Sequence, residues 1–548
     1  MTRAEKRQEN RAQEDELKRK KFEVQGFTFS TQKYHKKRNI ANRKSSCKTP
    51  EEEKLERQAT ADAALKVYRR TLPILLKRLS KINDPRQPKK IKHSLTVLMI
   101  YGILMFIYQQ SSLRNANKEM STAIFFKNMQ VMFPEFNTMP HADTLSRLLE
   151  RIKVDEIEES MLELFEQLVK KKKFRNNLIN KHYVIAIDGT QKFVRSEQWT
   201  KEALEKHVGK DKHGIYYVYV LEAVVIFENG MTLPLMSEFL NNEEYRDFRS
   251  NKQDCERKAF YRLSERIKKR FPKLKVSVTM DGLYACGPVI KVCREYGWDY
   301  MLVFKEGSMK DAWRESMGLI RLTPENVLKR GFRDRNQVYR WINDVEYAYG
   351  NNGRGKEKLH VVVCEETWEE TSRTTGETTS HSTRYVWISG KEITKTNVET
   401  RCLKIGRYRW KIENNFLVMK HQGYKYEHCF SYDWNAMVGF HYLMQIGRFI
   451  NVLLAHSELL DKKVKVLGIN GLLTFIFQAC TADVLDITHI PENSEGGFEC
   501  FNLVIFRNYS PLQASEMLKI IWTNISAYVI VEGSFSNRMI SSGKVTYI

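Results

Sequence analysis

YVIAIDGT, at Tyr183–Thr190, is a run of apolar residues that stops at Asp188. A short apolar run bounded by a turn signal predicts a buried strand, here with an aspartate at its end. A second run of this kind, KVSVTM, leads to Asp281, and 92 residues separate the two aspartates. Between them, the stretches IYYVYVLEAVVIF and MTLPLMSEFL flank Glu228-Asn229-Gly230, and Asn-Gly between two apolar runs predicts a β-hairpin.

The elements around these runs alternate in type across residues 181–306. After the predicted hairpin come the charged helical stretch DCERKAFYRLSERIKKRF, the strand before Asp281, a helix near Pro288–Tyr296 and the strand YMLVFK. The resulting order, β-β-β-α-β-α-β, resembles that of a ribonuclease-H-like core. We therefore expect the α/β class, with a ribonuclease-H-like mixed sheet flanked by helices.

The regions on either side of this core differ from it in composition and in the spacing of their apolar residues. Residues 1–50 carry 15 Lys and Arg against 6 Asp and Glu, which predicts a flexible or DNA-contacting basic arm. Apolar residues at helical spacing predict an all-helical N-terminal domain over 51–180. Runs of β type and a Thr-rich loop predict a β-rich insertion over 307–398. The core resumes as helices over 399–488, and the tail at 489–548 is uninformative.

The net charge of the chain limits the classes of partner that it would bind. Its 548 residues include 90 Lys and Arg against 66 Asp and Glu, and the net charge of +24 favours a polyanion, with nucleic acid the first candidate. Basic ribosome-associated or membrane-surface proteins share such a balance. The 9 cysteines are scattered and form no C-x2-C pair, so we expect reduced thiols and no zinc module.

The sequence predicts a cytoplasmic protein without a membrane segment. The N-terminus is too charged for a signal peptide. The longest apolar stretch, Leu95–Tyr108, has 14 residues where a membrane span needs about 20, so we expect a buried helix. A Walker-type glycine loop and a G-x-S-x-G elbow are both missing from the sequence, which leaves ATP-dependent and serine-nucleophile mechanisms without support.

Three carboxylates can meet at one edge of the predicted sheet. Asp188 and Asp281 each end an apolar strand, and Glu413 lies on a later helix. Such an oxygen-rich site suits Mg2+, which keeps several waters and shares its coordination with substrate phosphates. Two ions could activate a water or a 3′-hydroxyl and stabilise the leaving oxygen, which amounts to DNA strand cleavage and transfer. Taken singly, however, an Asp-Gly after a strand is more often a turn than a metal ligand.

The neighbours of Glu413 carry a family resemblance. Arg409, Glu413 and Lys420 share one helix face, although an exposed ion-paired surface has the same pattern. The run RWKIENNFLVMK fits R-x3-E-x6-K, which resembles the signature of bacterial insertion-sequence transposases of the IS4 type, where the glutamate completes a DDE triad. DGLY, at Asp281–Tyr284, resembles the D-x-x-Y motif of that family, and AIDGT resembles its first-aspartate motif. The resemblance covers about residues 180–430.

This resemblance implies roles for particular residues. Asp188, Asp281 and Glu413 would be the catalytic residues and the ligands of two Mg2+ or Mn2+ ions. The residues that would bind DNA are Arg409, Lys420, Tyr408 and Tyr284. The family usually has a tyrosine where this chain has Gly406, and whether the nearby Tyr408 substitutes for it stays open. An aromatic residue of the insertion would stabilise a flipped base, with the candidates Trp341, Trp368 and Trp387.

The resemblance also implies a reaction and its partners. The expected reaction is cut-and-paste transposition, in which double-stranded DNA is cleaved at the terminal inverted repeats of an element and joined to target DNA. Whether a hairpin intermediate forms is left open. The implied assembly is a homodimer in a synaptic complex, acting at the nucleoid in a bacterial cytoplasm.

Three other interpretations compete with this one. A catalytically inactive, transposase-derived DNA-binding protein is the main alternative. A non-mobile nuclease on the same core is the second, and flanking terminal repeats would distinguish it. A phosphatase of the haloacid-dehalogenase type also has Asp-Gly-Thr after a strand, but its nucleophile is an aspartate at the position of Ala186.

Overall fold

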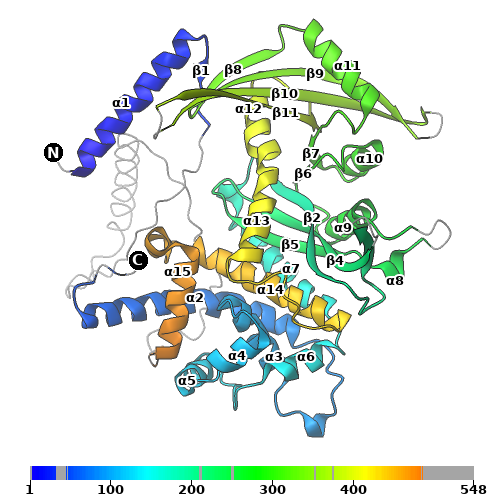
Figure 1. Cartoon of the computed structure of the whole chain (residues 1–548). Helices are drawn as coiled ribbons and strands as arrows, with labels where there is room; N and C mark the ends of the chain where they lie inside the picture. Colours follow the sequence, from blue (N-terminus) through cyan, green and yellow to red (C-terminus); the bar gives the residue numbers. More distant parts are fainter. Residues whose placement is uncertain are drawn as a thin grey trace, which may run out of the picture. The chain divides into compact units, whose positions relative to one another are not determined.

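The computed structural model describes residues 3–32, 45, 47–208, 213–247, 252–350, 353–372, 376–482 and 484 (Figure 1). The predicted tail at 489–548 lies outside the described residues, as does most of the basic run between Gln32 and Lys48. The sheet and the helices around it belong to the described part of the chain.

A mixed sheet forms the centre of the fold, as the alternating elements predict. Its central strands stand in the order β5-β4-β2-β6-β7. β2, β6 and β7 are parallel to one another, whereas β4 is antiparallel to both β2 and β5. β3 pairs with the far part of β4. The bounds are β2 (Tyr183–Arg195), β3 (Leu204–Val208), β4 (His213–Ile226), β5 (Thr232–Phe239), β6 (Val276–Met280) and β7 (Asp299–Val303).

The hairpin predicted at Asn229-Gly230 is confirmed. β4 and β5 pair in antiparallel register on either side of it. The Phe227 N–H donates to the Met231 carbonyl at 3.0 Å, and the Gly230 N–H donates to the Phe227 carbonyl at 2.9 Å. Gly230 has φ 84°, a backbone conformation that glycine adopts without strain. The local turn residues therefore set this register.

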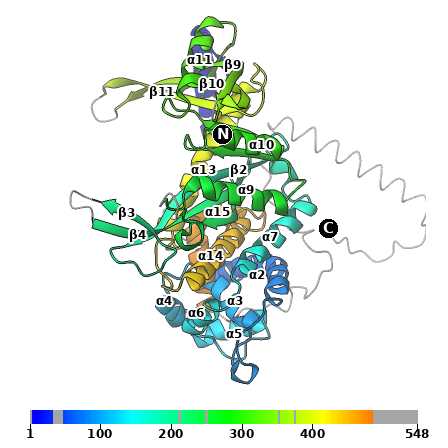
Figure 2. The same cartoon turned by 90° about the vertical axis from the view of Figure 1, so that its right-hand side faces the viewer.

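Helices cover both faces of the sheet. Ala186 of β2 packs against Ile412 of α13 (Trp410–His421), whereas Gly189 lies against Glu256 at the start of α9 (Glu256–Arg270). Residues three apart in a strand point to opposite faces, so these two helices flank β2 on its two sides. Figures 1 and 2 show this arrangement. α14 (Trp434–Ala455) packs against β5, and α10 (Gly287–Glu295) connects β6 to β7.

Residues 51–180 fold as helices, as the spacing of their apolar residues predicts. The apolar run forms α3 (Leu95–Ile107), in which every residue except Thr96 is buried, and it packs on α14. It is thus the buried core helix expected. The remaining helices are α2 (Pro50–Leu79), α4 (Leu113–Glu119), α5 (Ala123–Met132), α6 (Ala142–Leu149) and α7 (Asp155–Lys170).

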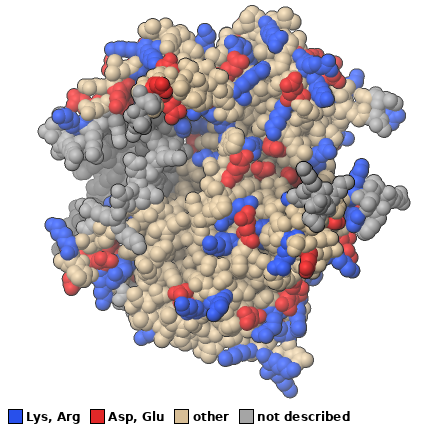
Figure 3. Space-filling model, in the orientation of Figure 1, with Lys and Arg blue, Asp and Glu red and all other residues tan. Residues whose placement is uncertain are grey.

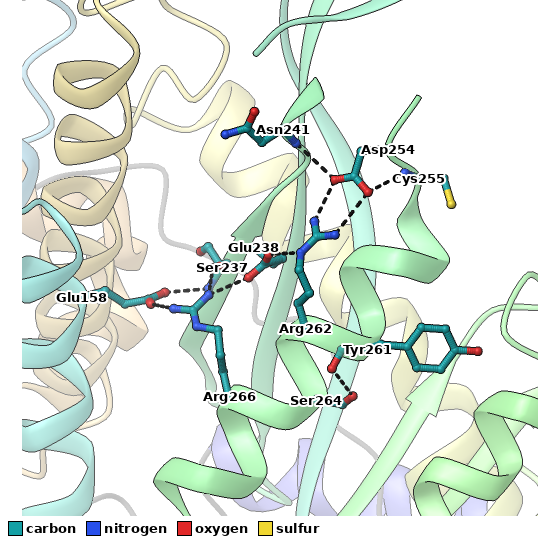
Figure 4. A network of polar contacts seen from close by, with 10 residues as sticks. All are labelled: Glu158, Ser237, Glu238, Asn241, Asp254, Cys255, Tyr261, Arg262, Ser264 and Arg266. Carbon is teal, nitrogen blue, oxygen red and sulfur yellow. Dashed lines mark hydrogen bonds and ion pairs between the residues drawn. The ribbon is translucent and has the colours of Figure 1, made fainter. Parts of the chain in front are cut away.

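An ion-pair network ties this helical region to the sheet (Figure 4). Arg266 of α9 reaches Glu158 of α7 and lies 2.8 Å from Glu238 of β5. Arg262, one turn earlier, binds Glu238 at 2.6 Å and Asp254 at 2.7 Å. The carboxylates are almost completely buried, and pairing each with an arginine offsets the cost of removing its charge from water. α7, β5 and α9 are therefore held together.

Among the described helices, one is long and apolar enough to cross a membrane by length and composition. This is α15 (Asp461–Ala482), which is interrupted at Gly468 and packs against α2 and α5. Core helices pass the same test, so a single such helix is weak evidence for a membrane span.

The β-rich insertion extends the central sheet. β11 pairs with β7, so that Trp387 stands opposite Val303, and β10, β9 and β8 follow in order. The bounds are α11 (Lys310–Leu322), β8 (Val327–Phe332), β9 (Arg335–Tyr349), β10 (Gly355–Thr371) and β11 (Thr378–Ser389). The insertion is therefore continuous with the core.

The described part of residues 1–50 differs from the flexible arm expected there. It forms the helix α1 (Arg3–Val24) and the strand β1 (Thr28–Phe29), which pairs with β8 in parallel. Phe22 is buried and fills the space beside Gly331, where a Cβ would lie 2.5 Å from its ring. Apolar anchors at Phe22 and Phe29 thus fix a segment whose charged composition predicts no packing.

Candidate active site

Asp188 and Asp281 lie side by side on the parallel strands β2 and β6. Asp281 follows the end of β6, as predicted, but Asp188 does not end its strand, because β2 continues to Arg195 through its pairing with β4. The last register pair between β2 and β6 joins Ala186 to Thr279. Two residues further along, Asp188 stands beside Asp281, the residue that follows β6. Asp188 Oδ1 accepts the Gly189 N–H at 3.0 Å, and Asp281 Oδ1 accepts the Leu283 N–H at 2.8 Å. Each carboxylate is therefore held by a local backbone donor.

Asp188 lies in an environment that disfavours its charge. Burial raises the pKa of Asp188 to about 6, and the negative charge of Asp281 adds to that effect. The Arg409 guanidinium acts in the opposite direction and lowers the pKa of Asp188. A cation placed between the two aspartates would relieve the same repulsion.

Arg409 joins Asp188 to Glu413. The chain enters this region through α12 (Val398–Arg401), a π turn (Cys402–Gly406) and a 3-10 turn (Arg407–Arg409), and α13 follows directly. Ile412 and Phe416 pack on the face of the sheet that carries Asp188. Arg409 Nη1 lies 3.4 Å from Asp188 Oδ2, and Nη2 lies 2.6 Å from Glu413 Oε1. The predicted glutamate is therefore linked to the first aspartate through one guanidinium.

The carboxylates do not form a complete three-ligand metal centre. In the described part of the chain, no group of three Asp, Glu, His or Cys residues could hold a metal ion. Arg409 lies between Asp188 and Glu413. Asp188 and Asp281 alone still fit the chemistry of Mg2+, which is commonly bound through one or two carboxylates together with substrate phosphates.

The residues predicted to bind DNA have different surroundings. Lys420 pairs with Glu427 at 2.9 Å, and Tyr408 is partly buried against the core. Tyr284 lies inside the core with 0% of its surface exposed, and its hydroxyl donates to Glu256 at 3.1 Å. In this structure Tyr284 therefore offers no surface to a phosphate or a base.

The three tryptophans of the insertion are not equivalent. Trp341 and Trp387 are buried. Trp368 is partly exposed, with the Arg335 guanidinium 3.9 Å from the centre of its ring. Of the three candidates, Trp368 is thus the one with accessible surface.

Trp387 fills the space next to Gly406. A Cβ at position 406 would lie 2.9 Å from both Cε2 and Nε1 of the Trp387 indole. The ring of Trp387 also stacks on Tyr385, with centroids 5.6 Å apart. The departure from the family pattern at Gly406 therefore has a steric explanation, because a side chain there would collide with the indole.

The sequence analysis does not identify Glu256 or Tyr219 as site residues, and it assigns Tyr284 to DNA rather than to Glu256. Glu256 accepts hydrogen bonds from Tyr219 at 2.8 Å and from Tyr284 at 3.1 Å. Its negative charge also contributes to the raised pKa of Asp188. The pattern IYYVYV predicts a strand but gives no sign that one of its tyrosines binds a carboxylate near the site.

The surface charge does not single out a DNA path on the face shown in Figure 3. Lys and Arg are spread over that face and alternate with Asp and Glu. On this face, therefore, no patch of a single sign marks a binding surface for DNA.

One comparison with known proteins bears on the family. A family model described as DDE_Tnp_1-associated matches residues 76–164, from the end of α2 into α7. No curated protein matches the chain. The matched segment contains none of the three candidate carboxylates. The match to this family model associates the chain with transposases of the DDE type.

Proposed function

We propose that the protein is a DDE transposase of the IS4 type that cleaves DNA at the ends of an insertion sequence and transfers the strands to target DNA. The main support is the proximity of Asp188, within β2, to Asp281, which follows β6, with Glu413 linked to Asp188 through Arg409. The match of the helical region to the DDE-associated family model agrees with it.

The strand order supports a ribonuclease-H-like core. Three antiparallel strands, β5-β4-β2, continue into the parallel strands β6 and β7, with α9 before β6 and α10 before β7. Asp188 lies within the first strand of this unit, β2, and Asp281 follows the fourth, β6.

The carboxylates would hold the cations that the reaction needs. Asp188 and Asp281 supply hard oxygen ligands, and Glu413 completes the set when Arg409 turns from it to a DNA phosphate. Two bound Mg2+ or Mn2+ ions would activate the attacking oxygen and stabilise the leaving one. The protein residues would orient the scissile phosphate.

Double-stranded DNA is the proposed partner. Arg409 and Lys420 would bind backbone phosphates near the terminal repeat, Tyr408 would contact the same strand, and Trp368 would stack on a displaced base. A homodimer would bring two ends together. The reaction would take place at the nucleoid of a bacterial cytoplasm.

Cleavage of a labelled duplex that carries the terminal repeat of the element tests this proposal. We expect nicking at the repeat boundary with Mg2+, none with EDTA, and none in Glu413→Gln. Glu295→Gln is the matched control, because Glu295 is exposed on α10 and pairs with Lys291 of the same helix, away from the candidate site.

Two results would contradict the proposal. Repeat binding without cleavage by the unmodified protein, under every divalent metal, would favour a catalytically inactive DNA-binding protein. Cleavage that survives in Glu413→Gln would show that the third carboxylate lies elsewhere.

A further inference from the structure

Glu256 binds the hydroxyls of two tyrosines from different parts of the sheet. Glu256 is the first residue of α9. Its Oε1 accepts from Tyr219 of β4 at 2.8 Å, and its Oε2 accepts from Tyr284, after β6, at 3.1 Å. Both oxygens of one carboxylate are therefore engaged by side chains that come from opposite sides of β2.

The same carboxylate lies against the strand that carries Asp188. Gly189 follows Asp188, and a Cβ at this position would lie 2.9 Å from Glu256 Cδ and 2.4 Å from a ring carbon of Tyr219. Only a glycine lets the backbone of β2 approach the Tyr219–Glu256 pair this closely. The position of Glu256 is thus coupled to that of the first aspartate.

Tyr284 connects Glu256 to the second aspartate. It lies three residues after Asp281, and its N–H donates to the Asp281 carbonyl at 3.3 Å. Its ring is completely buried and packs against Phe260 of α9. The turn that carries Asp281 can therefore move away from α9 only if the hydrogen bond between Tyr284 and Glu256 breaks.

We propose that Glu256 is a positioning residue that fixes the separation of Asp188 and Asp281 through Gly189, Tyr219 and Tyr284. The inference rests on the proposed function, because it assigns the separation of the aspartates to cation binding. Residues that hold metal ligands in place act in this way, and their loss typically lowers metal affinity about 10–100-fold. Here Glu256 holds the backbone on which the ligands stand.

Binding of Mn2+ to the full chain, measured from the electron paramagnetic resonance signal of the free ion, tests this assignment without any reaction. We expect Tyr284→Phe and Glu256→Gln each to weaken Mn2+ binding by about 10-fold, and Asp188→Asn to abolish it. Tyr219→Phe should weaken it as well. The effects of Tyr284→Phe and Glu256→Gln should not add in the double variant, because both break the same contact.

Tyr101→Phe is the matched control. Tyr101 is equally buried, and its hydroxyl also donates one hydrogen bond of 3.1 Å, to Asn117 in the helical region. A loss of affinity in Tyr101→Phe as large as in Tyr284→Phe would show a general effect of core loosening and would overturn the assignment. The assignment also fails if Tyr284→Phe and Glu256→Gln bind Mn2+ like the unmodified protein.

The same Mn2+ measurement distinguishes a failure of the proposed function from a failure of this inference. If the unmodified protein binds Mn2+ no better than Asp188→Asn, the cation site itself is absent. That result would overturn the proposed function together with this inference. Normal Mn2+ binding in the unmodified protein and in Glu256→Gln would overturn only the role of Glu256.

Discussion

Replacing Gly406 with alanine adds a methyl group next to a ring that has no room to move. Gly406 has helical φ and ψ of −59° and −50°, so its backbone accepts alanine without strain. The added Cβ, however, would lie 2.9 Å from two atoms of the Trp387 indole. Trp387 is only 2% exposed and stacks on Tyr385, so the indole cannot shift outward.

Two opposing terms set the magnitude of this effect. Alanine is favoured over glycine in a helix by about 1 kcal/mol. Overpacking a well-packed core costs about 1–3 kcal/mol. We therefore expect Gly406→Ala to lower the free energy of unfolding by about 1 kcal/mol. In a Trp387→Ala background the collision is gone, so the same substitution should raise the free energy of unfolding by about 1 kcal/mol.

Urea unfolding followed by circular dichroism measures this change of sign. The four proteins of the cycle are the unmodified chain, each single variant and the double variant, and the expected coupling is about 2 kcal/mol. We choose circular dichroism because Trp387→Ala removes a tryptophan and would change a fluorescence signal. The steric argument is refuted if Gly406→Ala raises the free energy of unfolding of the unmodified protein. It is also refuted if the substitution changes the free energy of unfolding equally with and without Trp387.

Two further predictions concern buried charges. Glu366 is 0% exposed and binds Arg335 and Arg407, so Glu366→Ala should lower the free energy of unfolding by about 3–5 kcal/mol. The side chain of the neighbouring Glu365 is 45% exposed, so Glu365→Ala should lower it by at most about 1 kcal/mol. Equal losses for the two variants in urea unfolding would contradict this prediction. Burial lowers the pKa of His441 well below 6.5, so below about pH 6.5 the unfolded chain takes up a proton that the folded chain does not. The free energy of unfolding should therefore fall as the pH is lowered, with His441 contributing up to about 1.4 kcal/mol per pH unit. His441→Gln should remove this contribution to the pH dependence of the free energy of unfolding between pH 5 and 7. An unchanged pH dependence in that variant would show that His441 is protonated in the folded protein.

The parts of the fold that the sequence predicts are those set by local patterns. The apolar run at Tyr183 and the Asn229-Gly230 turn each specify a strand or a hairpin within a few residues. The i, i+4 spacing of Arg409 and Glu413 likewise predicts their ion pair. The two aspartates come together because β2 and β6 pair in parallel, but the pattern wrongly ends β2 at Asp188, whereas the strand continues to Arg195.

Contacts between distant segments could not be predicted in this way. The pairing of β11 with β7 joins residues more than 80 positions apart, and no local pattern specifies it. The docking of Phe22 beside Gly331 depends on a shape that exists only after folding. The same holds for Glu256, because the sequence around Tyr219 and Tyr284 gives no sign of this shared partner until the sheet brings the three residues together.

The charges at the sheet edge connect this geometry to the proposed chemistry. Arg409 compensates two carboxylates, Asp188 and Glu413. A guanidinium that binds a DNA phosphate through two parallel hydrogen bonds has few donors left for either of them. Under the proposed function, DNA binding would therefore withdraw Arg409 and leave carboxylates whose repulsion a divalent cation relieves. Because such coupling is reciprocal, DNA and cations would strengthen the binding of each other, and Glu413 would join the cation site of Asp188 and Asp281 only when DNA is bound.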